Sequence, residues 1–570
     1  MVFNSYEFVL LFMPIFLILF YLVRNSGIKK GNEKLSCELL VVMGSLAFFI
    51  PFGAKNVAVL GISVVWNICT AIPMSFMRDQ NVRIRAFGRE VYPHKIWLAM
   101  GVCGNLILLL FFKLWGVFLP IAISFYTFNQ ISYIVDLYRG EVTEFKLLDY
   151  LTYVLFFPKL LQGPLMGYED FQKEMDRACG VDKMVEAGSY FDEKNECSTK
   201  VRSKKLDYEV LLRGLLLFSL GLFKKVILAD TFGKAVDSSF AVIADAIGRG
   251  AVAGTGMLGL GIDVDLGMGS LEAILTAVFY SFQLYFDFSG YCDMATAICM
   301  VMGFDLPLNF NSPYKAVNIA DFWKRWHISL TKFFTKYVYI PLGGNRRGAA
   351  RMYVNFMIVF LLSGFWHGTG WTFIIWGAMH GVMYVIDRAV MKCGESKNAS
   401  DTMHSKKDIA ENNGHCSVKR NDCELDECNK GDSLGTNIFH AIRVALTFIY
   451  VTAAWVFFRA DTAVQALSLF RQMVVGGSRA LSSNFTAGFR LDELWYVIKV
   501  TPIMKLSISW DVPMWLFLAC ASVIIFFGKT AIDYAKSCKI GIKTTLLTAL
   551  LLVWCVLSFG GVSTFLYMNF

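Results

Sequence analysis

The sequence predicts an all-α, polytopic integral membrane protein, and three observations support this fold class. Of its 570 residues, 56% are hydrophobic and only 17% are charged, whereas about a quarter of the residues in a soluble domain are charged. Several apolar runs reach the length that a helix needs to cross the hydrocarbon core of a bilayer. The same runs are continuous rather than alternating in polarity, which argues against a membrane β-barrel.

The apolar runs give the expected order of the membrane helices. We expect spans near residues 6–23, 38–52, 57–77, 96–112, 117–137, 208–229, 271–303, 352–365, 369–390, 438–459, 513–528 and 544–560. Two shorter runs, 38–52 and 150–166, are expected to be tilted or re-entrant, because they are shorter than the usual membrane-spanning length.

Basic residues between the runs predict the orientation, because lysine and arginine are enriched in the cytoplasmic loops of membrane proteins. They cluster at 24–34, 78–95 and 529–543, so we expect these segments in the cytoplasm and the N-terminus outside. The first apolar run has no basic segment before it, which favours a retained span over a cleaved signal peptide. The net charge of +9 is typical of such loops, and no nucleic-acid-binding motif accompanies it.

Polar segments interrupt what otherwise reads as a single membrane domain over residues 1–570. Inserts at about 168–207 and 392–437 mix acidic and basic residues and lack apolar periodicity, and the second has the composition of a loosely folded segment. A further polar stretch at about 460–512 has some amphipathic character. The cysteines and histidine at 415–428 have no spacing typical of a zinc site, so no metal site is expected. No internal repeat is present, which disfavours a transporter built from inverted repeats.

Two histidines stand out, because each directly follows a tryptophan in an aromatic stretch expected at membrane depth. His327 lies within 321–330 and His367 within 363–371, and the chain has only seven histidines. Ionisable side chains at this depth are costly and mark functional sites, and imidazole is suited to moving a proton near neutral pH. A packing role, with the ring hydrogen-bonded in the interior, stays open for both.

Two buried histidines are sufficient for acyl transfer without a metal. One would act as a general base toward a hydroxyl that attacks an acyl carbonyl. The other would hydrogen-bond the carbonyl oxygen, orient the donor or protonate the leaving group. Because no GxSxG motif supplies a serine nucleophile, direct transfer from a thioester to an alcohol is the chemistry that fits.

The segment 318–350 alternates aromatic and basic residues and is too polar to span, which is typical of an interfacial or re-entrant helix. We expect this helix to carry His327 into the protein, with Asp321 and Arg325 paired one turn apart. The turn at 341–348 is either a phosphate-binding turn or a basic loop at the lipid headgroups.

Small and acidic residues within the apolar runs indicate close packing and buried polar contacts. Two GxxxG pairs, which allow helices to approach closely, lie at 364–368 and 377–381. Asp293 is expected to orient a histidine, to pair with a base or to serve as a structural hydrogen-bond partner.

These residues resemble the membrane-bound O-acyltransferase (MBOAT) family, and most closely its branch of alginate O-acetylation membrane proteins. The matching segments are 119–128 with 132–140, 157–164, 283–295, 309–346, 365–377, 455–460 and 565–570. The resemblance covers nearly the whole chain except the two polar inserts, and the segments together are far more specific than any one of them.

The resemblance implies a ring of about eleven membrane helices around a funnel or tunnel, with re-entrant or interfacial helices. It matches His367 with the family's central catalytic histidine and His327 with its second polar active-site position. It also implies a thioester donor, acetyl-CoA or an acyl carrier protein, that enters from the cytoplasmic face, with no tightly bound cofactor and no metal. The residues expected to face this anionic donor are Lys324, Arg325, Trp326, Lys332, Lys336, Arg346 and Arg347, with Asp293 and Asp321 as supporting polar residues.

We therefore expect an O-acyltransferase that moves acetyl from a cytoplasmic thioester toward a polysaccharide outside the membrane, with His367 as general base and His327 assisting. The expected setting is the cytoplasmic membrane of a bacterium, with the lipid bilayer, a secreted or membrane-anchored SGNH-type acetyltransferase and an acyl carrier protein as candidate partners. Three alternatives remain open. They are D-alanyl transfer to teichoic acid, a proton-coupled transporter that uses the histidines as a relay, and a scaffold in a polymer-export complex.

Overall fold

The computed structural model describes residues 1–30, 33–80, 83–86, 89–115, 118–180, 207–249, 266–412, 434–491, 511–561 and 565–566. Within these ranges the regular structure is helical, apart from a two-stranded antiparallel hairpin formed by β1 (Ile84–Ala86) and β2 (Arg89–Val91). This hairpin lies in the basic segment 78–95 and pairs Ile84 with Val91. The all-α prediction is confirmed except at this short hairpin.

Eight helices among the described residues are long and apolar enough to cross a membrane, which supports a polytopic membrane protein. They are η1 with α1 (Glu7–Phe12 and Met13–Lys30), α2 (Glu33–Phe49) with η2 (Ile50–Phe52), α3 (Ala54–Asp79), α4 (Pro93–Leu114), α14 (Ala349–His367), α15 (Trp371–Asn412), α16 (Leu434–Arg459), and α22 (Ile542–Leu557) with η7 (Ser558–Gly561). The bent pair α20 (Asp511–Phe526) and α21 (Ala531–Ser537), at 71°, is a ninth candidate if it forms one broken span.

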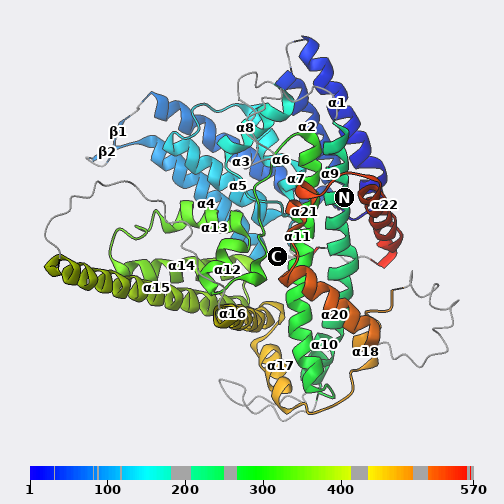
Figure 1. Cartoon of the computed structure of the whole chain (residues 1–570). Helices are drawn as coiled ribbons and strands as arrows, with labels where there is room; N and C mark the ends of the chain where they lie inside the picture. The colour runs from blue at the N-terminus through cyan, green and yellow to red at the C-terminus, as the bar shows by residue number, and fades with distance from the viewer. Residues whose placement is uncertain are drawn as a thin grey trace.

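A central group of helices is buried by protein. The helix α11 (Ser270–Met302) is buried along nearly its whole length, and α5 (Ile123–Arg139) is similarly buried. Packed against α11 are α9 (Tyr208–Leu222), η3 (Phe223–Ala229) and α10 (Asp230–Gly248), as Figure 1 shows in the middle of the molecule. The predicted spans 117–137, 208–229 and 271–303 coincide with these helices, whose polar and aromatic side chains contact protein.

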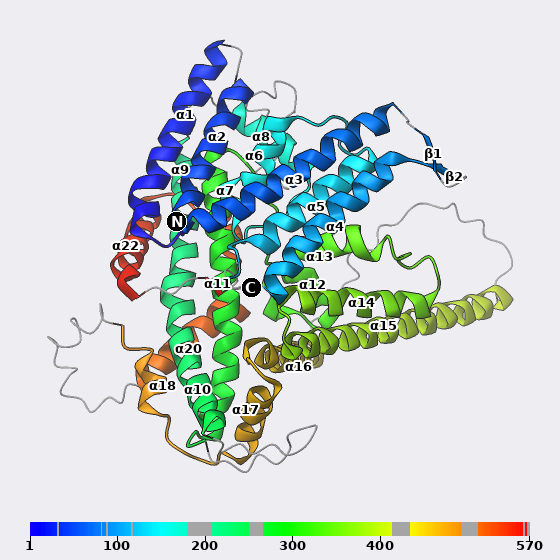
Figure 2. The ribbon, with the colours of Figure 1, turned by 180° about the vertical axis from the view of Figure 1, so that it is seen from behind.

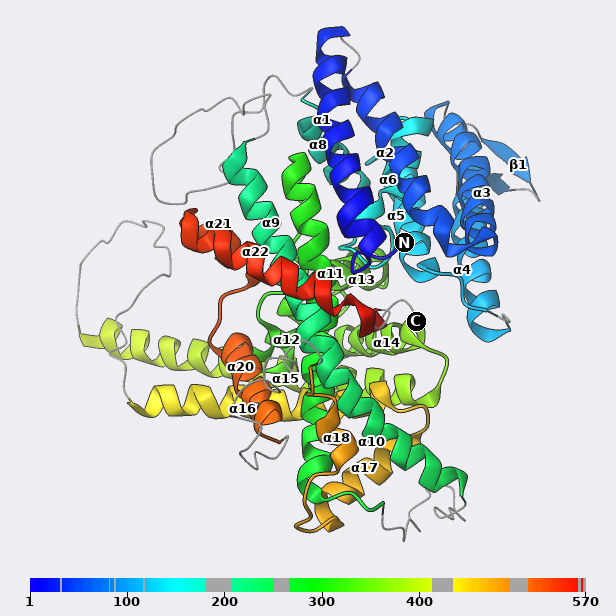
Figure 3. The same ribbon diagram turned by 90° about the vertical axis from the view of Figure 1, so that its right-hand side faces the viewer.

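Two helix groups lie beside α11. In one, α3 and α4 pack with α5, and the other consists of α14, α15 and α16. Figure 2 shows both to the right of α11, one above the other. Four short elements lie between α11 and α14 in the chain: η4 (Pro313–Lys315), α12 (Ile319–Arg325), α13 (Ile328–Phe334) and η5 (Thr335–Tyr339). The helices α20 and α22 cover the side that faces the viewer in Figure 3.

The polar segments contain helices where the structure describes them. The first insert begins with α8 (Tyr168–Cys179), and α15 continues into the second insert as far as Asn412. The polar loop 460–512 contains α17 (Ala463–Val475) and α18 (Ser483–Ala487). Residues 181–206, 413–433 and 492–510 lie outside the described residues, and so do the cysteines and histidine at 415–428. The short run 150–166 forms part of α6 (Leu147–Leu155) and all of α7 (Phe157–Leu160), neither of which is long enough to span.

The two ends of the chain meet on α11. The ring of Phe3 stacks on Tyr291 with 4.8 Å between centroids, and Phe565 meets the same tyrosine edge-on at 5.2 Å. The backbone N–H of Leu566 donates to the carboxylate of Asp287 at 3.0 Å. Phe565 and Leu566, which begin one of the segments of the family resemblance, are therefore held at the centre of the protein.

Candidate active site

A break between two short helices positions His327. The sequence predicts an interfacial or re-entrant helix within 318–350, and the structure has two short helices there, since α12 ends at Arg325 and α13 begins at Ile328. At the break His327 has a φ of 44°, in the left-handed region, which most residues avoid. The backbone N–H of Ile328 donates to the carbonyl of Asn309 at 3.0 Å. The helix expected in this segment is therefore interrupted at His327, because pairing with the segment at 309 replaces helical hydrogen bonds at this point.

His327 is buried and its orientation is defined by Asn309. The side chain is 1% exposed, and its ring meets Phe288 edge-on at 4.8 Å. Its Nδ1 lies 3.2 Å from Oδ1 of Asn309. The same Oδ1 accepts from the backbone N–H of Ser329 at 3.1 Å and from its hydroxyl at 2.9 Å, so it is the amide oxygen that faces His327.

This hydrogen bond determines the tautomer of His327. Because Asn309 presents an acceptor, Nδ1 carries the proton, and in the neutral ring Nε2 keeps its lone pair. Burial lowers the pKa of His327, which lies between the candidate spans, to about 3, so the ring is neutral at physiological pH. Nε2 is buried and has no hydrogen-bond partner among the described residues. The ring can therefore accept a hydrogen bond from a bound substrate.

His367 closes α14 inside an aromatic enclosure. It is 4% exposed, and the rings around it are Trp366 at 4.6 Å, Trp376 at 5.1 Å and Phe458 at 5.0 Å between centroids. Lys113 donates to the backbone carbonyl of Trp366. Both Lys113 and His327 lie within electrostatic range of His367. The fold thus brings together the two histidines that the sequence singled out.

Close contact between α14 and α15 shapes this enclosure. A Cβ added at Gly377 would lie 2.6 Å from the carbonyl oxygen of Phe360, and one added at Gly381 would lie 2.9 Å from the sulfur of Met357. The first contact is with rigid backbone, so Gly377 is required for this approach, whereas the second is with the end of a flexible methionine side chain that can move aside. The close approach expected from the GxxxG pairs is confirmed.

Two cavities lie on opposite faces of α13. One has a volume of about 580 Å³ and is bordered by Leu330, Thr331, Phe334 and Thr335. The other has a volume of about 740 Å³ and is bordered by Ser329, Lys332, Phe333 and Lys336. We call them the Trp323 cavity and the Ser329 cavity after a residue that lines each. Both volumes suit a small-molecule ligand.

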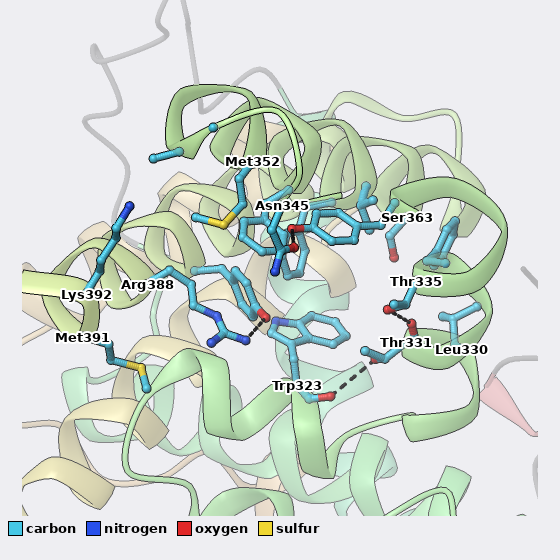
Figure 4. A pocket seen from close by; sticks show the side chains of 18 residues that line it. Trp323, Leu330, Thr331, Thr335, Asn345, Met352, Ser363, Arg388, Met391 and Lys392 are labelled. Carbon is cyan, nitrogen blue, oxygen red and sulfur yellow. Dashed lines mark hydrogen bonds between the residues drawn. The ribbon is translucent and has the colours of Figure 1, made fainter. Parts of the chain in front are cut away.

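The Trp323 cavity combines an apolar wall with a basic end. Figure 4 shows Arg388 and Lys392 on one side and Ser363 on the other, one turn before His367 on α14. Aromatic and methionine side chains form most of the wall between them: Trp323, Phe334, Tyr339, Met352, Phe356, Phe360, Tyr384 and Met391. No acidic residue is among the described residues that line it. The cavity therefore suits a ligand with an anionic end and an apolar arm.

The Ser329 cavity has mixed charge. Its basic residues are Lys173, Arg177, Lys332 and Lys336, and its acidic residues are Asp170, Glu174 and Asp305. Arg177 pairs with Asp305 at 2.8 Å, and Lys336 pairs outside the cavity with Asp136 at 3.0 Å. Because these ion pairs neutralise much of the basic charge, this cavity is less suited to an anion than the Trp323 cavity.

Both cavities border η5, which places them at the same end as the basic segment 78–95. Arg78 donates to the carbonyl of Val142 at 2.9 Å, and Lys336 of η5 pairs with Glu141 at 2.5 Å. The helix α4 starts at this end and reaches Lys113, which contacts Trp366, near its other end. His367 therefore lies toward the end opposite to the basic segment.

Of the predicted donor-binding residues, Lys332 and Lys336 line the Ser329 cavity, and the other five line neither cavity. Lys324, Arg346 and Arg347 are exposed, and Arg325 pairs with Asp321 at 2.9 Å, as the spacing predicted. Trp326 is buried against other aromatic rings. The neighbours of the two arginines, Asn345 and Gly348, do border the Trp323 cavity. The turn at 341–348 thus lies beside that cavity.

Asp293 lies in the interior and pairs with a base. Its carboxylate accepts from Lys224 at 2.6 Å, and both residues are buried. Of the roles open from the sequence, the structure shows pairing with a base. Asp321 serves the local structure of α12, through Arg325 and the backbone N–H of Val317 at 3.3 Å.

Three residues of this region were missed by sequence reasoning. Asn309 lies in a segment that matches the family, but nothing local indicates that it contacts His327. His380 is a buried histidine on α15 between the close-packed glycines 377 and 381, and its position in an apolar run was the available signal. Asp387 accepts from the backbone N–H groups at the start of α12, and only the fold reveals this contact.

Comparisons with known proteins identify the family. A model of the membrane-bound O-acyltransferase family matches residues 270–406, which include His327, His367 and His380. The chain is 30% identical to the peptidoglycan O-acetyltransferase of Helicobacter pylori, over 100% of this chain and 98% of that protein. It is 31% identical to a probable alginate O-acetylase AlgI of Pseudomonas fluorescens, over 85% and 77% of the two chains.

A more distant relative has a different acyl group in its name. The teichoic acid D-alanyltransferase of Streptococcus thermophilus is 26% identical, over 51% of this chain and 62% of that protein. The family assignment rests on the relative from Helicobacter pylori, because the match covers 98% of that protein. The chain therefore belongs to the membrane-bound O-acyltransferase family and is an O-acyltransferase.

Proposed function

We propose that this protein transfers acetyl from a cytoplasmic thioester toward a polysaccharide outside the membrane, which a partner transferase outside the membrane then acetylates. The observation that carries the proposal is that His327 and His367 are both buried among aromatic rings and lie close enough to interact electrostatically. A cavity suited to an anionic donor begins at the basic end of the protein, and His367 lies toward the other end. This arrangement suits a reaction whose two substrates arrive from opposite sides.

In the proposed reaction, His367 takes the proton of the acceptor hydroxyl as its oxygen attacks the thioester carbonyl. The new C–O bond forms a tetrahedral intermediate, which collapses as the C–S bond breaks. The proton held by His367 passes to the leaving thiolate, so the products are an ester and a free thiol. No external oxidant, reductant or metal enters this balance.

His327 assists by accepting a hydrogen bond. Its Nδ1–H is directed to Asn309, and the neutral Nε2 is an acceptor. A neutral acceptor nitrogen does not stabilise a developing oxyanion, which requires a donor. Of the roles open from the sequence, the geometry therefore favours orientation of a substrate O–H or N–H group.

The Trp323 cavity is the proposed donor site. Coenzyme A and acyl carrier proteins both present a phosphopantetheine arm, which joins a phosphate to a long, largely apolar thioester chain. Arg388 and Lys392 would meet the phosphate, and the apolar wall would carry the arm toward Ser363. The exposed Arg346 and Arg347 would add positive charge beside the entrance.

Peptidoglycan is the first acceptor to test, because the relative that bears this name matches the full length of the chain. The setting that we propose is the cytoplasmic membrane of a bacterium, with the basic segment 78–95 inside and an SGNH-type transferase as a partner outside. We include α5, α9 with η3, and α11 as membrane-crossing helices, which would bring the ring to about eleven spans. Their burial by protein explains their polar composition.

Ester-linked acetate on purified peptidoglycan tests this function in a deletion strain. The strain would be complemented with wild type, His367→Ala, His327→Ala or the control His440→Ala, whose side chain is exposed on α16. We expect wild type and the control to restore acetate, with a loss of about 100-fold or more for His367→Ala, at equal membrane levels. Full acetate with His367→Ala would refute the role of that residue.

D-alanyl transfer to teichoic acid is the second candidate, because relatives of that name match about half of the chain. The same strains would be assayed for ester-linked D-alanine. Loss of D-alanine with unchanged acetate in the deletion strain would replace the first proposal with the second.

A further inference from the structure

A third buried histidine, His380, contacts residues close to each of the two histidines of the proposed site. His380 lies on α15 and is 0% exposed. Its ring meets Trp323 at 5.2 Å and Trp376 at 5.0 Å between centroids, and stacks on Phe322 at 6.2 Å. Two of these partners belong to α12, which leads into His327, and one belongs to α15.

Trp323 donates a hydrogen bond from Nε1 to Nδ1 of His380, at 3.3 Å. An indole N–H is only a donor, so Nδ1 of His380 keeps its lone pair and the neutral ring carries its proton on Nε2. This tautomer is the opposite of the one assigned to His327. The contact joins a side chain one turn before His327 to the middle of α15.

The same face of α15 holds α12 at a second point. Asp387, two turns after His380, accepts from the backbone N–H groups of Ile319 and Ala320 at 2.7 and 3.1 Å. These two N–H groups belong to the first turn of α12, which has no helical acceptor for them. Together the two contacts define both the position and the rotation of α12, and hence of the break at His327.

His380 also supports the enclosure of His367. Trp376 lies one turn before His380 on α15, and its ring meets His367 edge-on at 5.1 Å and 87°. The ring of Trp376 is thus flanked by His380 on one side and His367 on another. The His380 side chain therefore contacts both Trp323, which precedes the break at His327, and Trp376, which contacts His367.

We propose that His380 is a positioning residue of the acyl-transfer site, which holds Trp323 by a hydrogen bond and Trp376 by packing and so sets the relative placement of His327 and His367. The proposal rests on the proposed function. Its physical basis is that small displacements of catalytic groups cause large losses of rate. It predicts that activity depends on the hydrogen-bond acceptor Nδ1 of His380 and not on Nε2.

Two substitutions, His380→Asn and His380→Phe, distinguish a hydrogen-bonding role of His380 from a role in packing alone. In His380→Asn the amide oxygen takes the place of Nδ1 as an acceptor but removes Nε2, whereas His380→Phe keeps an aromatic ring without an acceptor. We expect His380→Asn to retain acetate within about 3-fold of wild type and His380→Phe to lose about 10- to 100-fold. The matched control is His440→Asn, at an exposed position of α16. A loss as large in His380→Asn as in His380→Phe would overturn the proposal.

A double-mutant cycle tests whether the effect passes through Trp323. Because Trp323 lines the donor cavity, Trp323→Phe alone is expected to lower activity. In the Trp323→Phe background, His380→Phe should then lower activity by less than about 3-fold, because the effects of substituting two residues that act through one contact are not additive. Undiminished loss in that background would show that His380 acts by another route.

A readout independent of activity keeps the inference testable if the proposed function fails. Protein labelled with 15N-histidine contains seven histidines, each with two ring nitrogens, and His380→Asn identifies the ring signals of His380 by their loss. We expect these signals to show a protonated Nε2 and an unprotonated Nδ1, and to move in Trp323→Phe but not in the control His440→Asn. A protonated Nδ1 would overturn the proposal whatever reaction the protein performs.

Discussion

Nδ1 of His327 and Oδ1 of Asn309 lie 3.2 Å apart, at the break between α12 and α13. The amide cannot turn away without losing the backbone N–H of Ser329, which it accepts at 3.1 Å. The hydrogen bonds of Asn309 also stabilise the turn at which His327 adopts its left-handed backbone conformation. A single side chain therefore defines the tautomer of one proposed active-site histidine and secures the turn on which it sits.

Replacing this amide with a carboxylate should alter the pH dependence of the reaction. Burial lowers the pKa of His327 to about 3, so in wild type Nε2 stays unprotonated well below neutral pH. In Asn309→Asp the nearby negative charge favours the protonated ring and raises this pKa. We expect the acid limb of activity to move to higher pH, so that activity is lost earlier as the pH falls.

The measurement is acetyl transfer by isolated membranes over a range of pH, at matched protein levels. Asn311→Asp is the matched control, because this residue is two positions away and exposed. An unchanged acid limb in Asn309→Asp would contradict the assignment of His327 as an acceptor in the reaction.

The buried pair Lys224–Asp293, at 2.6 Å, is predicted to support the fold rather than the chemistry. Asp293→Ala should destabilise the protein by about 3–5 kcal/mol, because it leaves the lysine unpaired in the interior. The double variant Lys224→Met/Asp293→Leu should regain most of the membrane level and activity. Thermal unfolding in detergent and acetate per unit of membrane protein would measure both. A stable but inactive double variant would instead indicate a direct role for this pair.

The contact between α14 and α15 should not tolerate a methyl group. In Gly377→Ala the new Cβ would lie 2.6 Å from the carbonyl oxygen of Phe360, and the helices would have to move apart. We expect destabilisation of about 1–3 kcal/mol and reduced activity, since His367 lies on α14. The matched control is Gly61→Ala on α3, where nothing lies within 4 Å of the added atom. Thermal unfolding curves of the two variants compare them directly, and equal stability would contradict the close contact.

Neutralising the basic end of the Trp323 cavity should weaken donor binding. For Arg388→Gln/Lys392→Gln we expect the KM for acetyl-CoA to rise by about 10-fold, because charge-assisted hydrogen bonds to the phosphate are lost. The kcat should stay within about 2-fold, since these groups lie away from the reacting atoms. Membrane vesicles with the basic end outward allow titration of the donor. Arg249→Gln, at an exposed arginine that lines neither cavity, is the control, and a fall in kcat alone would contradict the assignment.

Local features of the sequence predicted much of the fold and part of the site. Run length and polarity identified helices that are long and apolar enough to cross a membrane, and residue spacing identified the Asp321–Arg325 pair and the close glycines of α14 and α15. The break at His327 within 318–350 was not predictable, because the hydrogen bonds that stabilise it come from the segment at 309. The cavity-lining residues also differed from the predicted donor set, because charge along a loop does not reveal which side chains face an enclosed space.

What the sequence by itself determined is the class of molecule and its two central histidines. Both follow from properties read along the chain: hydrophobic length, the rarity of ionisable groups in apolar stretches, and motifs of the family. Only the tertiary structure decided that Asn309 orients His327, that His380 and Asp387 join α15 to α12, and that Lys224 neutralises Asp293. Each of these contacts joins separate helices or loops, so its existence depends on how those segments pack, and no local pattern carries that information.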